Sequence, residues 1–458
     1  MKKHIHKFET TLWLAIKVIL YVSVMAVFVF MLGKESIGLT KLSRTMGITV
    51  STFVVVGLLF LSVYGKYDVG RRKSKPIIYS LALATLCTDV ISYLQLMIMK
   101  TSVSVTEFRF VSVGLLCGAY IVQLILIVLF VYGGNWLFFK IHKPEKCCVI
   151  TVSQKSLDEI AYAIGRFKKQ YEIRDVLDYR DPNLKEHIKH AETVFAYDVP
   201  VERRTEILRM CYKYKVNVYY NPDIEDVMGM NATQYVLDDI YLINKNVKAM
   251  TMEQRVIKRV MDIVLSLVLG ILSAPIWLIS MIVVKAHDGG PILFKQERAT
   301  INGKKFMVYK LRTMKVDAEI RSASKDDDRI TKPGKILRKL RIDELPQLLN
   351  VLKGDMTFVG PRPEMLKNVI AYTQDLPEFK YRLRMKAGLT GYAQIAGKYN
   401  TTPKDKLIMD MMYIEQFSIL RDIQLILQTA IVLLKKDSTE GFANGPLRKE
   451  IVFKEYKE

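Results

Sequence analysis

The chain is poor in the residues that many enzymes use for metal-bound or histidine-based chemistry. Of its 458 residues, only five are cysteine and six are histidine. The cysteines show no metal-site spacing, and we interpret them as reduced packing residues that face the cytoplasm. No histidine is paired in the sequence with a nucleophilic serine or cysteine. These shortages argue against a zinc site, a disulfide framework and a histidine-dependent triad.

The chain also lacks a nucleic-acid motif, although its formal net charge is +22. The basic residues are scattered among apolar runs, so we assign the excess charge to cytoplasmic loops and lipid-facing surfaces and expect no nucleic-acid partner. Half of the residues are hydrophobic and a quarter are charged. This mixture predicts membrane segments joined to soluble domains.

Four apolar stretches, at about 11–33, 47–64, 76–99 and 111–139, are each long enough to span roughly 30 Å of hydrocarbon. No small-residue cleavage site follows the first stretch, so we do not expect a removable signal peptide. Basic residues are densest at the N-terminus, in the second loop and after the fourth stretch, which predicts that both ends of this group of helices lie in the cytoplasm. Asp89, within the third stretch, is either functional or a helix-interface residue paired with a hydroxyl.

Residues 141–248 alternate between strand and helix patterns, which predicts a small Rossmann-like α/β module with a parallel sheet. Its first turn, Val152-Ser153-Gln154-Lys155-Ser156, has no glycine that would let backbone approach a pyrophosphate. We therefore predict that the module binds no dinucleotide. A scaffold or oligomerisation role, which could hold a homodimer, is the preferred interpretation.

A fifth apolar run at 256–284 has cations at both ends and Pro275 near its middle. Proline removes a helix hydrogen bond and kinks or breaks the helix. From this segment alone, a re-entrant hairpin that enters and leaves one leaflet and an ordinary kinked span remain equally open.

The most informative segment is Arg341-Ile342-Asp343-Glu344-Leu345-Pro346-Gln347, followed by Gly360-Pro361-Arg362-Pro363. Two adjacent carboxylates among many cations suit chemistry on a phosphate: the cations bind it, and the acids supply a nucleophile, a base or a metal ligand. Taken alone, the acid pair is better explained as a helix start favoured by the helix dipole than as a catalytic pair. The neighbouring cations are Lys335, Arg338, Lys339, Arg341, Lys353 and Arg362.

With these and other motifs, the chain resembles the bacterial sugar transferases, the monotopic polyprenyl-phosphate phosphoglycosyl transferases. The upstream four stretches and α/β module resemble the long form that initiates exopolysaccharide or capsule assembly. The ordered matches lie at 258–262, 290–298, 303–304, 310–314, 328–331, 337–339, 343–348, 350–356, 359–363, 388–394 and 413–415.

The resemblance implies transfer of a sugar-1-phosphate from a cytoplasmic UDP-sugar to undecaprenyl phosphate, with release of UMP. Asp343 matches the family's nucleophile, which forms a covalent aspartyl phosphosugar, and Glu344 is its acidic partner. Mg²⁺ is the implied cofactor, with Asp343 among its ligands. The resemblance also favours a re-entrant helix around Pro275 in the lipid membrane.

Phosphate chemistry requires cations that neutralise charge, and arginine can hold a phosphate bidentately. We predict Lys310, Arg312, Arg338 and Arg362 as substrate-binding residues. Arg341 stands where the family commonly has a small hydroxyl residue, and it either contacts a phosphate or faces solvent. Two alternatives to the transferase are a non-catalytic receptor or scaffold that binds nucleotide-sugars, and a nucleotide-sugar hydrolase.

The predicted architecture is a membrane protein with three parts: a four-helix transmembrane bundle at 1–140, the α/β Rossmann-like module at 141–248, and an α-rich catalytic domain at 249–458 anchored by the re-entrant helix 256–284. We expect a multi-pass protein of the bacterial cell membrane with its catalytic domain on the cytoplasmic face.

Overall fold

The computed structural model describes residues 2–101, 112–245, 247, 250–316, 318, 327–397, 402–434 and 453. The chain divides into two compact units, one containing Met1–Asn221 and the other Pro222–Pro446. The division falls at 221/222, inside the range predicted for the α/β module. The domain boundaries at 140/141 and 248/249 stay predictions.

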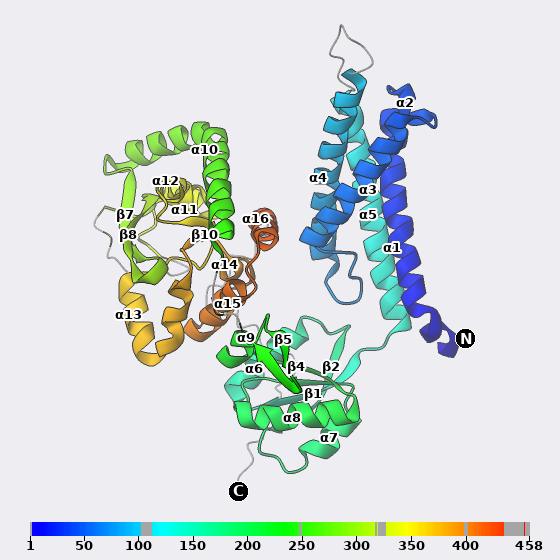
Figure 1. Cartoon of the computed structure of the whole chain (residues 1–458), viewed down its shortest axis with the longest axis vertical. Helices are drawn as coiled ribbons and strands as arrows, with labels where there is room; N and C mark the ends of the chain where they lie inside the picture. Colours follow the sequence, from blue (N-terminus) through cyan, green and yellow to red (C-terminus); the bar gives the residue numbers. More distant parts are fainter. Residues whose placement is uncertain are drawn as a thin grey trace. The chain divides into compact units, whose positions relative to one another are not determined.

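The first unit begins with long apolar helices (Figure 1): α1 (Lys2–Gly33), α3 (Arg44–Tyr64), α4 (Ser74–Thr101) and α5 (Val113–Ile141), with the short α2 (Ile37–Thr40) between the first two. The four long helices cover the predicted apolar stretches apart from two residues: residue 111 lies outside the described residues, and Ser112 is the N-cap of α5. Each is long and apolar enough to span a membrane. α1 packs against α5, and α4 packs against α3 and α5. Leu20, Phe28, Leu81 and Ile127 are almost completely buried between them.

The rest of the first unit confirms the predicted parallel sheet. Its strands β1 (Glu145–Thr151), β2 (Tyr171–Asp178), β3 (Thr193–Ala196) and β4 (Asn217–Tyr220) lie in the order β2-β1-β3-β4. The connecting helices are α6 (Gln154–Gly165), α7 (Leu184–His190) and α8 (Val201–Tyr214). Parallel neighbours require such crossovers because consecutive strands start at the same edge of the sheet.

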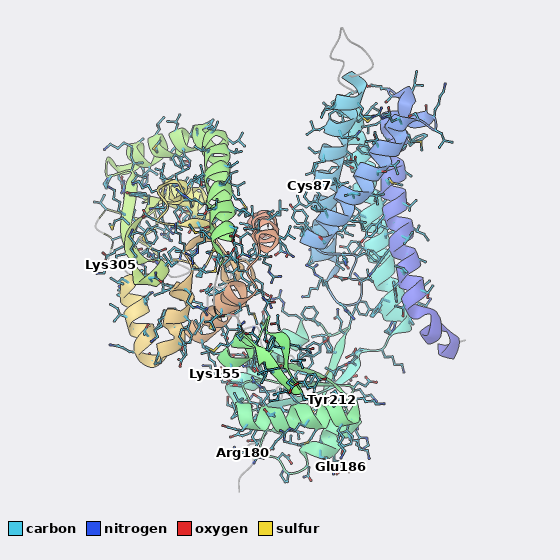
Figure 2. All side chains as sticks on the ribbon, viewed as in Figure 1. Cys87, Lys155, Arg180, Glu186, Tyr212 and Lys305 are labelled. Atoms are coloured by element: carbon cyan, nitrogen blue, oxygen red, sulfur yellow. The ribbon has the colours of Figure 1, made fainter. Side chains whose placement is uncertain are left out.

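The glycine-free first turn of this module is closed by a serine cap. The Ser153 hydroxyl accepts a hydrogen bond from the Ser156 backbone nitrogen at 3.2 Å and starts α6. Lys155, labelled in Figure 2, lies in the first turn of that helix. One backbone N–H group of the first turn of α6 is thus satisfied by a side chain of the chain itself.

The second unit combines short strand pairs with a helical core. β5 (Thr233–Leu237) pairs antiparallel with β6 (Ile240–Asn244), and β7 (Leu293–Ala299) with β8 (Lys305–Leu311), whereas β9 (Thr357–Val359) and β10 (Gly388–Thr390) are parallel. The helices are α9 (Ile224–Met228), α10 (Met252–Asp288), α11 (Lys332–Lys339), α12 (Gln347–Lys353), α13 (Leu366–Asp375), α14 (Tyr392–Ala396), α15 (Pro403–Glu415) and α16 (Ile419–Leu434), with 3-10 helices η1 (Ile301–Gly303), η2 (Ile342–Glu344) and η3 (Pro377–Arg384).

The core of this unit lies where β8, α12 and β9 meet α15 and α16. Val308, Val351, Val359 and Tyr413 are at most 2% exposed there. Burial of such side chains stabilises the unit by roughly 1.5–3 kcal/mol each. The core holds the ends of β8 and β9 close to the start of α12, and these are the places from which the candidate site is built.

Candidate active site

The acid pair lies in η2, a single 3-10 turn between α11 and α12. Arg341, just before it, has left-handed backbone with φ 58°, which is uncommon for a residue other than glycine. In a 3-10 helix, successive side chains point about 120° apart because there are about three residues per turn. Asp343 and Glu344 therefore face different surroundings although they are neighbours in the chain.

Glu344 is surrounded by cations. Its Oε1 accepts hydrogen bonds from Lys310 Nζ at 3.0 Å and from Arg362 Nη2 at 3.1 Å. Arg341 Nη1 lies 3.9 Å from its Oε2. Burial alone would raise the pKa of Glu344, but these three cations outweigh burial and hold it well below its usual range. Glu344 is thus an ionised, fixed counter-ion that orients Lys310 and Arg362.

Asp343 has the opposite character. Asp343 is only 8% exposed, and its Oδ1 has no hydrogen-bond partner. Burial, followed by the neighbouring charge of Glu344, raises the pKa of Asp343 to about 6, although Lys310, Arg338 and Arg341 act in the other direction. A buried acceptor without a partner is costly, and a perturbed carboxyl of this kind is typical of a functional site.

Lys310 and Arg362 reach the acid pair from two different strands. Lys310 lies near the end of β8, and Arg362 lies in the loop that leaves β9 through Gly360. A Cβ at Gly360 would lie 2.3 Å from the Lys386 carbonyl oxygen, and one at Gly388 would lie 2.1 Å from the Gly360 nitrogen. Only glycine permits this approach of backbone to backbone, which fixes the start of the loop that carries Arg362.

Two buried or half-buried arginines that sequence reasoning did not single out hold this loop. Arg298 Nη1 donates to the Pro363 carbonyl oxygen at 3.1 Å, and Arg382 Nη2 donates to the Arg362 carbonyl oxygen at 2.8 Å. Arg382 Nε also donates to Asp410 Oδ2 at 2.9 Å. Arg298 lies within a segment that matches the family, and this match could have indicated a role in the site. No sequence pattern indicates that Arg382 pairs with Asp410.

The remaining two predicted substrate-binding residues differ in position. Arg338 Nε donates to Thr313 Oγ1 at 2.7 Å, and its charge acts to lower the pKa of Asp343. Arg312 instead holds both carboxylate oxygens of Asp288, with Nη1 2.6 Å from Oδ2, at the end of α10. The structure thus brings Lys310, Arg338 and Arg362 to the acid pair and engages Arg312 elsewhere. A phosphate-binding role for Arg312 stays a prediction.

The N-terminal part of α10 is fixed to the core by buried polar contacts. Lys258 forms an ion pair with Asp422 of α16 and donates to the Val359 carbonyl oxygen at 2.9 Å. One turn on, Asp262 Oδ1 accepts from the Phe358 backbone nitrogen at 2.8 Å. Because Val359 and Phe358 belong to β9, this end of α10 is tied to the strand that leads into the Arg362 loop.

The C-terminal part of α10 packs against the same unit. Val284 is buried against Leu311 and Leu337, and Arg312 holds Asp288. A straight helix of 37 residues would be roughly 55 Å long. Figure 1 instead shows α10 changing direction sharply along its length, and Pro275 lies inside it. Large apolar side chains between the two ends are exposed: Ile271, Leu272, Leu278, Ile279 and Ile282.

The residues around Asp343 can be tested for a fit to Mg²⁺. Among the described residues, no group of three or more His, Cys, Asp or Glu side chains could hold a metal ion. Mg²⁺ commonly binds through one or two carboxylates together with substrate phosphates and water. The partnerless, buried Oδ1 of Asp343 fits such a site, since it offers one protein ligand and leaves the others to substrate.

Comparison with known proteins matches residues 253–436 to the family described as "Bacterial sugar transferase". A UDP-glucose:undecaprenyl-phosphate glucose-1-phosphate transferase of Caulobacter vibrioides is 40% identical over 189 residues, which cover 40% of this chain and 71% of the relative. An uncharacterized sugar transferase of Bacillus subtilis is 36% identical over 186 residues, covering 40% of this chain and 91% of the relative.

A third relative differs in the sugar that its name gives. The UDP-N-acetylgalactosamine-undecaprenyl-phosphate N-acetylgalactosaminephosphotransferase of Aeromonas hydrophila is 38% identical over 184 residues, which cover 39% of this chain and 44% of the relative. The chain thus matches less than half of that protein's length. The family match includes the acid pair and its cations, because those residues lie between 253 and 436.

Proposed function

Because this chain belongs to the bacterial sugar transferase family, we propose that it transfers a sugar-1-phosphate from a UDP-sugar to undecaprenyl phosphate and releases UMP. The observation that carries this proposal is the contrast within the acid pair. Glu344 is occupied by Lys310 and Arg362, whereas Asp343 has a buried carboxylate oxygen with no partner. Asp343 is therefore the carboxylate that is free to react.

In the first step, a carboxylate oxygen of Asp343 attacks the β-phosphorus of the UDP-sugar. A bond from oxygen to phosphorus forms, the bond from phosphorus to the bridging oxygen breaks, and UMP leaves with that electron pair. In the second step, an oxygen of undecaprenyl phosphate attacks the same phosphorus, and the acyl phosphate bond breaks. The carboxylate of Asp343 is thereby regenerated, and the product is a lipid diphosphate sugar.

The cations make this attack feasible because a carboxylate and a pyrophosphate repel each other. Lys310 and Arg362, oriented by Glu344, and Arg338, beside Asp343, neutralise the phosphate oxygens and the developing charge on UMP. Arg341 is 37% exposed and lies near Glu344, so it is placed to meet an entering phosphate. The same cationic site serves both half-reactions, since each brings one phosphate group to the same carboxylate.

Asp343 is the residue that would hold Mg²⁺, together with phosphate oxygens of the substrate. When bound, Mg²⁺ supplies further neutralisation of phosphate charge. Lys310, Arg338 and Arg362 bind and orient the phosphate groups of the substrates and neutralise their charge independently of Mg²⁺.

The packing of α10 supports the membrane placement that this proposal requires. Both of its ends pack on the same unit, and its exposed apolar side chains lie between them. In our proposal α10 is re-entrant, so the catalytic unit stays on the cytoplasmic face, where UDP-sugars are found and the lipid phosphate lies at the bilayer surface. The protein then acts at the first membrane step of exopolysaccharide or capsule synthesis, and its α/β module serves as the contact of a homodimer.

The test uses the purified full chain in lipid nanodiscs with Mg²⁺. With a UDP-sugar and no lipid acceptor, the wild type should release UMP in a burst of at most one per site and carry a phosphosugar on Asp343, located by mass spectrometry. Asp343→Asn should lose both UMP release and lipid product. With both substrates, initial rates should give parallel double-reciprocal lines. Continuous UMP release without lipid would indicate a hydrolase, and no UMP release from any UDP-sugar would indicate a receptor or scaffold.

A further inference from the structure

The apolar interior of the four N-terminal helices contains a charged residue that the transferase reaction does not use. Asp89 of α4 is 1% exposed. It lies fifteen residues after Ser74 and ten before Met99, the ends of the candidate span, which is roughly 22 Å and 15 Å along the helix. Asp89 is therefore near the middle of a membrane-length helix, where ionisable residues are costly and commonly functional.

The structure pairs Asp89 with an amide, whereas the sequence left open a functional role and a helix-interface position paired with a hydroxyl. Gln123 of α5 is fully buried, and its Nε2 donates to Asp89 Oδ1 at 3.2 Å and to the Val24 carbonyl oxygen at 3.0 Å. These two bonds use both amide hydrogens. The orientation of the amide is thus defined, because a flipped amide would direct its oxygen at two other acceptors.

This arrangement leaves buried oxygen atoms without partners. Asp89 Oδ2 and Gln123 Oε1 have none, and neither has Ser92 Oγ, which lies three residues after Asp89 on the same face of α4. The hydroxyl of Tyr120 on α5 is engaged with the Ala82 carbonyl oxygen at 3.1 Å. No lysine, arginine or histidine pairs with Asp89 in the part of the chain that the structure describes. Three buried oxygens are thus without a partner at this depth.

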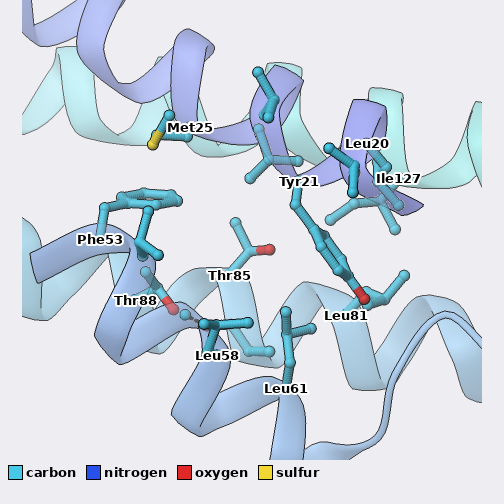
Figure 3. A pocket seen from close by; sticks show the side chains of 16 residues that line it. Leu20, Tyr21, Met25, Phe53, Leu58, Leu61, Leu81, Thr85, Thr88 and Ile127 are labelled. Carbon is cyan, nitrogen blue, oxygen red and sulfur yellow. Dashed lines mark hydrogen bonds between the residues drawn. The ribbon is translucent and has the colours of Figure 1, made fainter. Parts of the chain in front are cut away.

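A cavity lies within the same group of helices, and its lining does not include Asp89, Gln123 or Ser92. It has a volume of about 220 Å³ and lies between α1, α3 and α4, lined mostly by apolar side chains. Thr85, one turn before Asp89, and Val24, whose carbonyl accepts from Gln123, both contribute to its wall. Figure 3 shows the Thr85 hydroxyl among the apolar side chains. An apolar cavity stays dry, so the polar atoms of interest are the buried oxygens of Asp89, Gln123 and Ser92 and not the cavity wall.

We propose that Asp89, Gln123 and Ser92 form a binding site for a small monovalent cation, with Na⁺ as its ligand. Oxygen-only donors suit hard cations. One carboxylate compensates one positive charge, whereas a divalent ion would leave a net charge inside hydrocarbon. The cation joins α4 to α5 and, through the Gln123 bond to Val24, to α1. The site thereby stabilises the packing of these helices and is independent of the transferase reaction.

The test measures thermal unfolding of the full chain in nanodiscs of zwitterionic phosphatidylcholine, in NaCl and in choline chloride at equal ionic strength. Tryptophan fluorescence reports on these helices through Trp13 and Trp136 of α1 and α5. Na⁺ at ten times its Kd should raise the Tm of the wild type by about 3 °C. The wild type should also retain one ²²Na⁺ per chain.

Asp89→Asn should abolish both effects, and the exposed control Asp158→Asn, in α6, should retain both. Ser92→Ala keeps the charge and removes one ligand, so its half-saturating Na⁺ concentration should rise about tenfold or more. An unchanged Tm in Na⁺ with no retained ²²Na⁺ would overturn the proposal and leave a protonated carboxyl. If Asp89→Asn does not fold, Ser92→Ala decides, because an unchanged half-saturation in that variant refutes the ligand set.

Discussion

Replacing Asp343 by asparagine should raise the stability of the catalytic unit at neutral pH while it abolishes transfer. The reason is that burial raises the pKa of Asp343 from 3.8 to about 6. Above pH 6 the folded protein therefore contains an ionised carboxylate in surroundings that disfavour the charge, whereas the same group in the unfolded chain is solvated. Asparagine has nearly the same shape and no charge.

The magnitude follows from the shift. A pKa difference of about two units, at 1.36 kcal/mol per unit, corresponds to a cost to the folded state of about 3 kcal/mol. This cost is fully present above the folded-state pKa of about 6. It decreases as the pH falls toward 4, where both the folded and the unfolded chain bind the proton. For a unit of roughly 200 residues, 3 kcal/mol corresponds to a Tm difference of roughly 6–12 °C.

The assay compares thermal unfolding of wild type and Asp343→Asn between pH 4.5 and 8.5, without substrate and with a chelator. Trp277 packs against the core of the catalytic unit and provides a fluorescence signal. Asp375→Asn, the same substitution at an exposed position at the end of α13, should change the Tm little at any pH. The reasoning is refuted if Asp343→Asn is no more stable than the wild type at pH 7.5, or if its gain is as large at pH 4.5.

Three further predictions concern the surroundings of the acid pair. Glu344→Gln removes the charge that orients the cations, so the rate of UMP release should fall on the order of 10²–10⁴-fold while the affinity for the UDP-sugar, measured by calorimetry, changes little. Equal losses in the rate of UMP release and in UDP-sugar affinity would contradict this role. Arg362→Ala should reduce the rate of the UMP burst, whereas Arg312→Ala should mainly lower the Tm, because Arg312 holds Asp288; a larger burst defect in Arg312→Ala would restore its predicted phosphate role. A cysteine at Lys295 in a cysteine-free background should be protected from impermeant thiol reagents outside intact cells if α10 is re-entrant, and Pro275→Ala should favour labelling by straightening the helix.

Local sequence determined the secondary structure of much of this protein. Membrane-length apolar runs have no alternative to helix, since every backbone polar group must be satisfied within the segment. The alternation of strands and helices between 145 and 220 required crossovers and hence a parallel sheet. The acid pair was recognisable because Asp343 and Glu344 are adjacent in the sequence.

The roles within the site depended on tertiary structure. Lys310 and Arg312 are two residues apart, yet β8 ends at Leu311, so Lys310 reaches Glu344 and Arg312 turns to Asp288. From the sequence alone, neither Lys310 nor Arg312 can be preferred as a phosphate ligand, because the charge and the position of each residue suit a phosphate equally well.

The division of labour between Asp343 and Glu344 has the same origin. Their order in the chain fixes only that they are adjacent; the 3-10 turn and the packing around it decide that one carboxylate meets Lys310 and Arg362 while the other keeps a buried oxygen without a partner. Likewise, Asp89 and Gln123 lie 34 residues apart on different helices, and neither has a local signal for the other. Sequence by itself determined which segments are helical, apolar or charged, because those properties are local, whereas the pairing of charges was decided by tertiary packing, which alone sets distance and burial.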